Sequence, residues 1–155
     1  MQTSKIYKSQ IRVIYGHTDQ MGIVYYGRYL EYFEHARNEA LRQTGIKYTE
    51  LENNNIYLPV THASINYHKP AKYDDLLNIH CTIQQDIKSR LKYIMNCEIY
   101  NNYNQELLVS GHTEHIIINQ DGRPYRPRGQ ALELLNNLNG ILFGPLPNPP
   151  LQERE

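Results

Sequence analysis

The chain has no tryptophan, only two cysteines, no net charge and no long apolar run. Two cysteines, Cys81 and Cys97, are too few for a disulfide framework, and they favour a reducing cytoplasm. Sixteen basic residues balance sixteen acidic ones, so no overall field favours nucleic acid or an anionic membrane. No segment approaches the roughly 20 apolar residues of a membrane span, and the first residues lack the apolar core of a signal peptide. We therefore expect a cytoplasmic protein with neither nucleic acid nor membrane as a partner.

The length of 155 residues fits one domain. We expect this domain to occupy residues 1–142 and the proline-rich residues 143–155 to form a tail or strap. Residues 6–15 alternate between apolar and polar side chains, which predicts a half-buried strand with Tyr15 on its apolar side. From about Val24 to Thr44 apolar residues recur every three or four positions, which predicts a long helix that Gly45 ends as a left-handed cap. Its expected apolar stripe is Tyr25, Tyr29, Phe33, Ala36 and Ala40.

Four alternating runs follow a polar loop at residues 53–55 and predict four strands, near residues 63–67, 77–83, 91–99 and 107–118. Residues 130–138 then predict a short amphipathic helix with Leu132, Leu135 and Leu138 on one face. A strongly apolar helix needs cover, and a sheet of five strands offers one apolar face. The pattern therefore predicts an α+β fold, in which a five-stranded antiparallel sheet wraps around one long central helix. Cys81 and Cys97 fall on apolar strand faces and are expected to be small core residues.

A motif near the N-terminus carries the chemistry. The stretch from His17 to Arg37 contains Asp-x-x-Gly-Ile-Val-Tyr-Tyr-x-x-Tyr, followed by Glu-x-x-Arg. It places the carboxylate of Asp19 on a glycine-containing turn that leads into the predicted helix. A carboxylate can attack a carbonyl or activate water, and backbone N–H groups at a helix N-terminus can hold a developing oxyanion. Taken alone, this turn also has an ordinary explanation, because Asp and Gly dominate turns and Asp caps helices.

This motif resembles the active-site segment of the 4-hydroxybenzoyl-CoA thioesterase and YbgC-like acyl-CoA thioesterases, which are hotdog-fold enzymes. A second similar stretch runs from Leu58 to Asp75. The resemblance implies a hotdog fold and hydrolysis of an acyl-CoA, with Asp19 as nucleophile or general base. It also implies that the backbone N–H of Tyr26, at the start of the helix, polarises the thioester carbonyl. YbgC proteins carry histidine at the position of Tyr26. Because the implied donor is a main-chain group, this difference spares the oxyanion contact.

Hydrolysis of a thioester needs little more than a carboxylate and an oxyanion donor such as Asp19 and the Tyr26 N–H. The reason is that a thiol with a pKa of about 8.5 can leave as thiolate without a general acid. No Gly-x-Ser-x-Gly elbow competes with Asp19 for the catalytic role. Five residues around it are candidates for contact with the substrate: His17, Gly22, Ile23, Val24 and Tyr29. The alternatives are a structural role in the turn for His17 and Gly22 and a core position for Tyr29. Glu34 and Arg37, three residues apart on the helix, are expected to pair.

Coenzyme A also requires positive charge for its phosphates. Lys88 and Arg90 lie in a turn where the resembled hydroxybenzoyl enzymes place basic contacts to CoA. Arg126 and Arg128 approach the same region from the C-terminal side. The alternative is that all four are solvated. The resemblance further implies a homodimer or homotetramer with sites at subunit boundaries, so these residues would serve the Asp19 of a partner protomer.

The seven histidines predict no metal site, and the resemblance implies no cofactor besides the coenzyme A of the substrate. His112 and His115 fall on opposite faces of one strand, while His62 and His68 lie roughly 20 Å apart along another. Two other functions are left open. One is a thioesterase that acts on an acyl carrier protein, which would not need the four basic residues. The other is a non-catalytic acyl-CoA-binding protein, which would gain nothing from Asp19. The sequence does not specify the acyl group.

Overall fold

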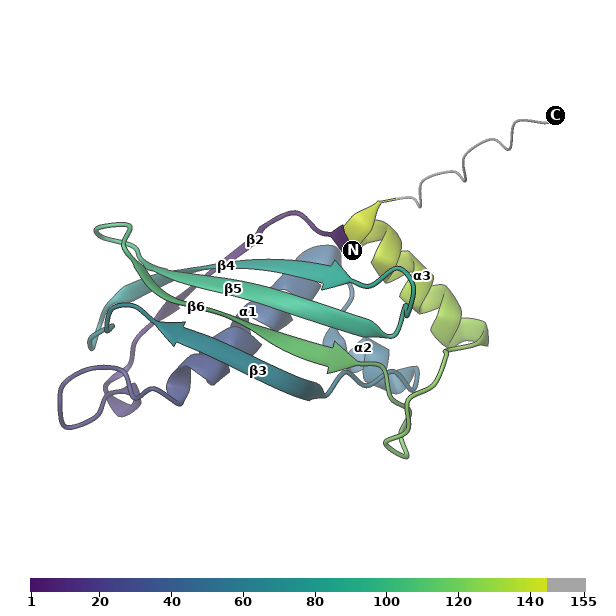
Figure 1. The fold of residues 1–155 in the computed structure, drawn as a ribbon, viewed down its shortest axis with the longest axis horizontal. Coiled ribbons are helices and arrows are strands. Elements are labelled where there is room, and N and C mark those ends of the chain that lie inside the picture. Colours follow the sequence, from purple (N-terminus) through teal and green to yellow (C-terminus); the bar gives the residue numbers. More distant parts are fainter. Residues whose placement is uncertain (145–155) are drawn as a thin grey trace.

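The computed structural model describes residues 1–144 and confirms an α+β fold, in which an antiparallel sheet wraps around one long helix (Figure 1). The expected tail, residues 143–155, lies outside the described residues from residue 145 onward. The helices of residues 1–144 include none that is long and apolar enough to cross a lipid bilayer.

The sheet is built from six segments: β1 (Gln2–Thr3), β2 (Tyr7–Arg12), β3 (Val60–Tyr67), β4 (Leu76–Gln85), β5 (Lys92–Asn101) and β6 (Leu107–Ile116). Their order is β1-β4-β5-β6-β3, and β2 also pairs with β4. β1 and β2 pair with different parts of the same edge of β4. The five predicted strands are therefore present as β2, β3, β4, β5 and β6, and the two-residue β1 is an additional strand that the sequence did not predict.

The central helix α1 (Arg28–Thr44) begins later than the predicted Val24. The backbone N–H of Val24 donates to the carbonyl of Ala71 at 2.9 Å, and that of Tyr25 donates to the carbonyl of His17 at 2.9 Å. These hydrogen bonds to distant parts of the chain hold residues 24 and 25 outside the helix. The helix ends as predicted, because Gly45 caps it in the left-handed region with a φ of 85°.

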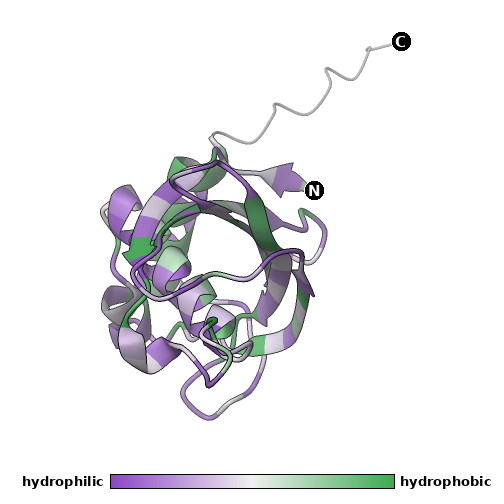
Figure 2. Cartoon of the chain, turned by 90° about the vertical axis from the view of Figure 1, so that its left-hand side faces the viewer, coloured by the Kyte–Doolittle hydropathy of each residue, from purple (hydrophilic) through white to green (hydrophobic). Residues whose placement is uncertain are grey.

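The core lies between α1 and the concave face of the sheet. In the turned view of Figure 2 the strands curve around the helix, which is seen nearly end-on. Four members of the predicted stripe are buried, whereas Tyr25 is 46% exposed because it precedes the helix. The strands contribute alternate side chains: Leu77, Ile79, Cys81 and Ile83 from β4, and Tyr93, Met95, Cys97 and Ile99 from β5. Cys81 and Cys97 oppose each other across these two strands and are buried, as expected for core residues.

Three other elements, η1, α2 and α3, differ from the sequence-based expectation. Tyr15 begins a 3-10 turn, η1 (Tyr15–His17), and is 77% exposed, so the buried face of the first strand ends before it. A helix that the sequence did not predict, α2 (Tyr48–Asn53), buries Leu51. The last helix, α3 (Gly129–Phe143), is longer than predicted and buries Leu135, Leu138 and Leu142, while Leu132 stays 41% exposed.

Candidate active site

Asp19 lies on a small hairpin between η1 and α1. The hairpin is closed by two backbone hydrogen bonds of 2.9 Å, from Asp19 N–H to the Ile23 carbonyl and from Gly22 N–H to the Asp19 carbonyl. Gly22 has a φ of 77°, a conformation that glycine adopts without strain. One carboxylate oxygen of Asp19 accepts a hydrogen bond from the Met21 N–H at 2.9 Å. The other oxygen makes no hydrogen bond within residues 1–144, so it is available to a substrate or to water.

A cleft of about 330 Å³ opens beside this carboxylate. Asp19 and Tyr26, the two predicted catalytic residues, both line it. Three predicted substrate contacts, Ile23, Val24 and Tyr29, line the same cleft. Val24 and Tyr29 are almost fully buried and so form its floor rather than its rim. The structure thus brings the two predicted catalytic residues and three of the five predicted substrate contacts to one place.

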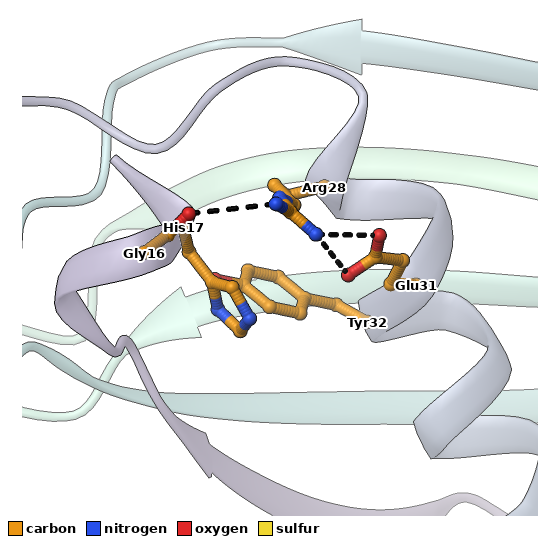
Figure 3. Close-up of polar contacts among 5 residues, drawn as sticks. All are labelled: Gly16, His17, Arg28, Glu31 and Tyr32. Carbon is orange, nitrogen blue, oxygen red and sulfur yellow. Dashed lines mark hydrogen bonds and ion pairs between the residues drawn. The ribbon is translucent and has the colours of Figure 1, made fainter. Parts of the chain in front are cut away.

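His17 fastens the hairpin to α1 instead of lining the cleft. Its Nδ1 lies 2.9 Å from the hydroxyl of Tyr32, a fully buried helix residue whose pKa is raised by burial, so the phenol stays protonated. Arg28 reaches back from the helix to the carbonyl of Gly16 at 3.4 Å (Figure 3). His17 and Gly22 therefore shape the loop that carries Asp19, and neither is among the residues that line the cleft.

The opposite wall comes from residues to which the sequence analysis assigned no role. Tyr67, at the end of β3, and the segment from His68 to Pro70 line the cleft across from the hairpin. The hydroxyl of Tyr67 donates to the carbonyl of Tyr26 at 3.1 Å, and its ring packs edge-on against Tyr29 at 5.6 Å between centroids. These residues belong to the second stretch that resembles the thioesterases, from Leu58 to Asp75, and that resemblance was the signal that could have identified them.

The backbone N–H of Tyr26 is directed away from the helix. Tyr26 precedes the first helical residue, Arg28, by two positions, so it lies just before the helix start rather than on it. The carbonyl of Tyr25 accepts the N–H of Arg28 at 2.9 Å. Because a trans peptide directs its C=O and N–H groups oppositely, the N–H of Tyr26 points the other way. It donates no hydrogen bond to any of residues 1–144 and is therefore available to a ligand.

The four basic residues expected to bind CoA lie far from Asp19 in the same protomer. Ile23 pairs with Lys72, which places the hairpin beside the start of β4, whereas Lys88 and Arg90 follow the end of that strand. A strand of this length spans about 30 Å. Figure 1 shows the two segments at opposite ends of the sheet.

Arg126 and Arg128 lie at the same end of the sheet as Lys88 and Arg90. They follow β6, whose last residue pairs with the first residue of β5, and they line an open cleft of their own with Asn55. All four basic side chains are exposed. The structure therefore brings the two basic turns to one end of the molecule but not to the cleft at Asp19.

The expected pair between Glu34 and Arg37 does not form within residues 1–144. Helix α1 instead carries two other ion pairs, Arg28 with Glu31 and Arg42 with Glu39. The Nε of Arg37 is buried, and the side chain borders a small apolar cavity beside His115. The Glu-x-x-Arg part of the motif therefore does not act as a surface ion pair.

Comparisons with known proteins agree with the fold and the motif. A family model for the thioesterase-like superfamily matches residues 13–150, and the chain belongs to this superfamily. YneP of Bacillus subtilis, a candidate acyl-CoA thioesterase by name, is 32% identical over 114 residues, which cover 74% of this chain and 80% of YneP. The acyl-CoA thioesterase YbgC of Haemophilus influenzae is 40% identical over 76 residues, which cover 48% of this chain and 56% of YbgC.

A solved structure supports the same assignment. The DHNA-CoA thioesterase of Staphylococcus aureus matches with a TM-score of 0.73 and 30% identity, covering 87% of this chain and 93% of that one. The prediction of a hotdog-fold thioester hydrolase is confirmed.

Proposed function

We propose that this protein hydrolyses a small or medium acyl-CoA to the free acid and coenzyme A. Asp19 acts either as the nucleophile or as the general base that activates water, and the backbone N–H of Tyr26 donates to the thioester carbonyl. One observation carries the proposal: Asp19 and Tyr26 line the same cleft, and within residues 1–144 one carboxylate oxygen of Asp19 and the backbone N–H of Tyr26 have no hydrogen-bond partner.

The chemistry requires few groups. When an oxygen nucleophile attacks the thioester carbon, negative charge develops on the carbonyl oxygen, and a pre-positioned N–H stabilises it. The C–S bond then breaks and the thiol leaves as thiolate, because its pKa is only about 8.5. If water is the nucleophile, Asp19 takes its proton and the free acid forms directly; if Asp19 is the nucleophile, water then cleaves the acyl anhydride and releases both the acid and Asp19. Asp19 and Tyr26 are sufficient for this sequence of steps, with no Ser-His-Asp triad.

The cleft supports an acyl group of limited size. Its volume of about 330 Å³ is at the lower end of the range for small-molecule sites. Tyr26, Tyr29 and Tyr67 contribute aromatic side chains to its walls, and burial raises the pKa of Tyr29, which keeps that phenol neutral. Neutral aromatic walls suit aliphatic and aromatic acyl groups alike.

The test compares thiol release from short, long and aromatic acyl-CoAs by the wild-type protein and by Asp19→Asn. Asparagine keeps an oxygen that can accept the Met21 N–H, so the hairpin is expected to fold. We expect turnover to fall by at least about 100-fold. Asp121→Asn, which alters an aspartate in another glycine turn, is the matched control and should keep full activity. An enzyme-only blank accounts for the two protein cysteines. Equal rates in wild type and Asp19→Asn would remove Asp19 from the mechanism.

An acyl-carrier-protein thioesterase is the second candidate with the same site. The grouping of four basic residues at one end of the sheet favours CoA, because only the nucleotide phosphates require such a cluster. Lys88→Ala with Arg90→Ala should therefore raise KM for acyl-CoA and leave KM for the corresponding acyl-pantetheine unchanged. Binding of acyl-CoA with no turnover by the wild type would instead indicate a non-catalytic binding protein.

A further inference from the structure

The convex face of the sheet, which points away from α1, carries a cluster of histidines. β3 and β6 pair antiparallel, with His62 opposite Glu114 and Ser64 opposite His112. Their neighbours on β6, Thr113 and His115, are buried on the concave face. Because side chains alternate along a strand, His62, His112 and Glu114 all project from the convex face.

These three side chains converge. One nitrogen of each imidazole and one carboxylate oxygen of Glu114 all lie within 4.8 Å of one another. The rings of His62 and His112 are 5.5 Å apart between centroids. His62 is exposed, whereas His112 and Glu114 are half-buried, so the group is open to solvent on one side. Sequence spacing along a single strand does not reveal this group, because its three side chains come from two paired strands.

Two imidazoles and one carboxylate form a donor set suited to Zn²⁺ and other late divalent metals of the first transition row. In a tetrahedral site with bonds of about 2.0 Å, the ligand atoms lie about 3.3 Å apart. The side chains therefore need to rotate inward by about 1 Å, while the strand pairing holds their backbones in place. A solvent molecule would complete the coordination on the open side.

We propose that His62, His112 and Glu114 bind one divalent transition-metal ion, such as Zn²⁺, on the convex face of the sheet. The site is separate from the candidate active site, because His62 precedes Tyr67 and His68 by about 17–20 Å along β3 and projects from the face opposite to Tyr67, whose ring packs against Tyr29 of α1. A bound ion would tie the edge strand β3 to β6.

Lys92 competes with the metal for Glu114. Its Nζ lies 2.8 Å from a carboxylate oxygen of Glu114, and this hydrogen bond lowers the pKa of Glu114, which keeps the carboxylate ionised. The Lys92 side chain is 46% exposed, so its ammonium group can turn into solvent when a metal arrives. Exposed ion pairs contribute little to stability, so the competition is modest. Because Lys92 occupies a carboxylate oxygen of Glu114, removal of this lysine should still tighten metal binding.

The experiment titrates the full chain, without a histidine tag and after treatment with chelator, with Co²⁺ as the probe. Calorimetry gives stoichiometry and affinity, and the visible spectrum of Co²⁺ reports coordination by the protein. We expect one Co²⁺ per chain, at least tenfold weaker binding in His112→Ala and Glu114→Gln, and tighter binding in Lys92→Met. His62→Ala removes an exposed ligand with little risk to folding and should also weaken binding tenfold or more.

The matched control is His80→Ala. His80 lies on the same face of the sheet but packs against Tyr100, 5.0 Å between centroids, outside the cluster. Its replacement should leave Co²⁺ affinity unchanged. The proposal is overturned if the wild type takes up no stoichiometric Co²⁺, or if His80→Ala weakens binding as much as His62→Ala does. Wild-type affinity in Glu114→Gln would also overturn the proposal, because Glu114 would then not be a ligand.

Discussion

His115 is a buried histidine whose hydrogen bonds define its state. Its Nδ1 lies 3.0 Å from the carbonyl of Leu58, which can only accept, so Nδ1 carries the hydrogen. Its Nε2 lies 2.8 Å from the hydroxyl of Thr113, which donates to it when the ring is neutral. Burial, with the nearby charge of Arg37, lowers the pKa of His115. The folded protein therefore favours the neutral ring.

This lowered pKa makes stability depend on pH. The unfolded chain binds the proton near the ordinary histidine pKa of about 6.5, whereas the folded chain binds it only at a lower pH. Between these two values the unfolded state holds more protons, so the free energy of unfolding falls as pH falls. His115→Asn, which does not titrate, should be less stable than wild type at pH 7.5 by about 1–3 kcal/mol. We expect that difference to narrow toward pH 5.5 in urea titrations. A difference as large at pH 5.5 as at pH 7.5 would contradict the assignment.

At the scale of elements, Gly111 allows α1 to lie directly on the sheet. A Cβ atom at this position of β6 would be 2.3 Å from the carbonyl oxygen of Ser64 in β3 and 3.0 Å from the ring of Phe33 in α1. Because the nearer atom is backbone, the strand itself would have to shift.

Gly111→Ala should therefore destabilise the protein. We expect a loss of about 1–3 kcal/mol or more, typical of an overpacked core, measured as a lower urea midpoint with an unchanged slope. Gly140→Ala is the matched control, because that glycine lies in helix α3 and the added Cβ would meet nothing within 4 Å beyond its chain neighbours and the backbone of its own helix. It should stabilise the protein by up to about 1 kcal/mol. Equal midpoints for Gly111→Ala and wild type would show that β3 and β6 can separate at little cost.

The sequence predicted those elements that have one continuously buried face. β4 and β5 alternate because α1 covers one side of them, and the stripe from Tyr29 to Ala40 follows from the same contact. The start of α1 could not be predicted, since Val24 and Tyr25 fit the helical spacing and leave the helix only through hydrogen bonds to distant residues. α2 buries only Leu51, so it has no periodic pattern to detect.

At the scale of the whole molecule, the site was predictable where it is contiguous in sequence. Asp19 and Tyr26 belong to one motif and line one cleft. The wall that begins at Tyr67 could not be placed without knowing how β3 lies beside α1. The cluster at His62 likewise forms only when β3 pairs with β6 in the observed register. Both were missed because their residues meet through tertiary structure.

The separation between Asp19 and the basic turns supports the expectation that a site uses two protomers. Lys88 and Arg90 lie about 30 Å from the Asp19 hairpin along the sheet. Within one protomer, Asp19 could therefore contact the thioester while these basic side chains contact the CoA phosphates only if the ligand were nearly extended. A symmetric dimer in which the basic end of one protomer meets the hairpin of the other would contain this arrangement twice.

Subunit complementation tests this arrangement. Asp19→Asn and the double variant Lys88→Glu with Arg90→Glu should each be nearly inactive at acyl-CoA concentrations far below the wild-type KM. If the two are co-expressed in equal amounts, half of the dimers are mixed. One of the two sites in each mixed dimer then combines an intact Asp19 with intact basic residues, so activity should return to about one quarter of the wild-type value. Thiol release from the purified mixture measures it. A mixture no more active than the sum of the separate variants would place Asp19 and its basic residues in the same protomer.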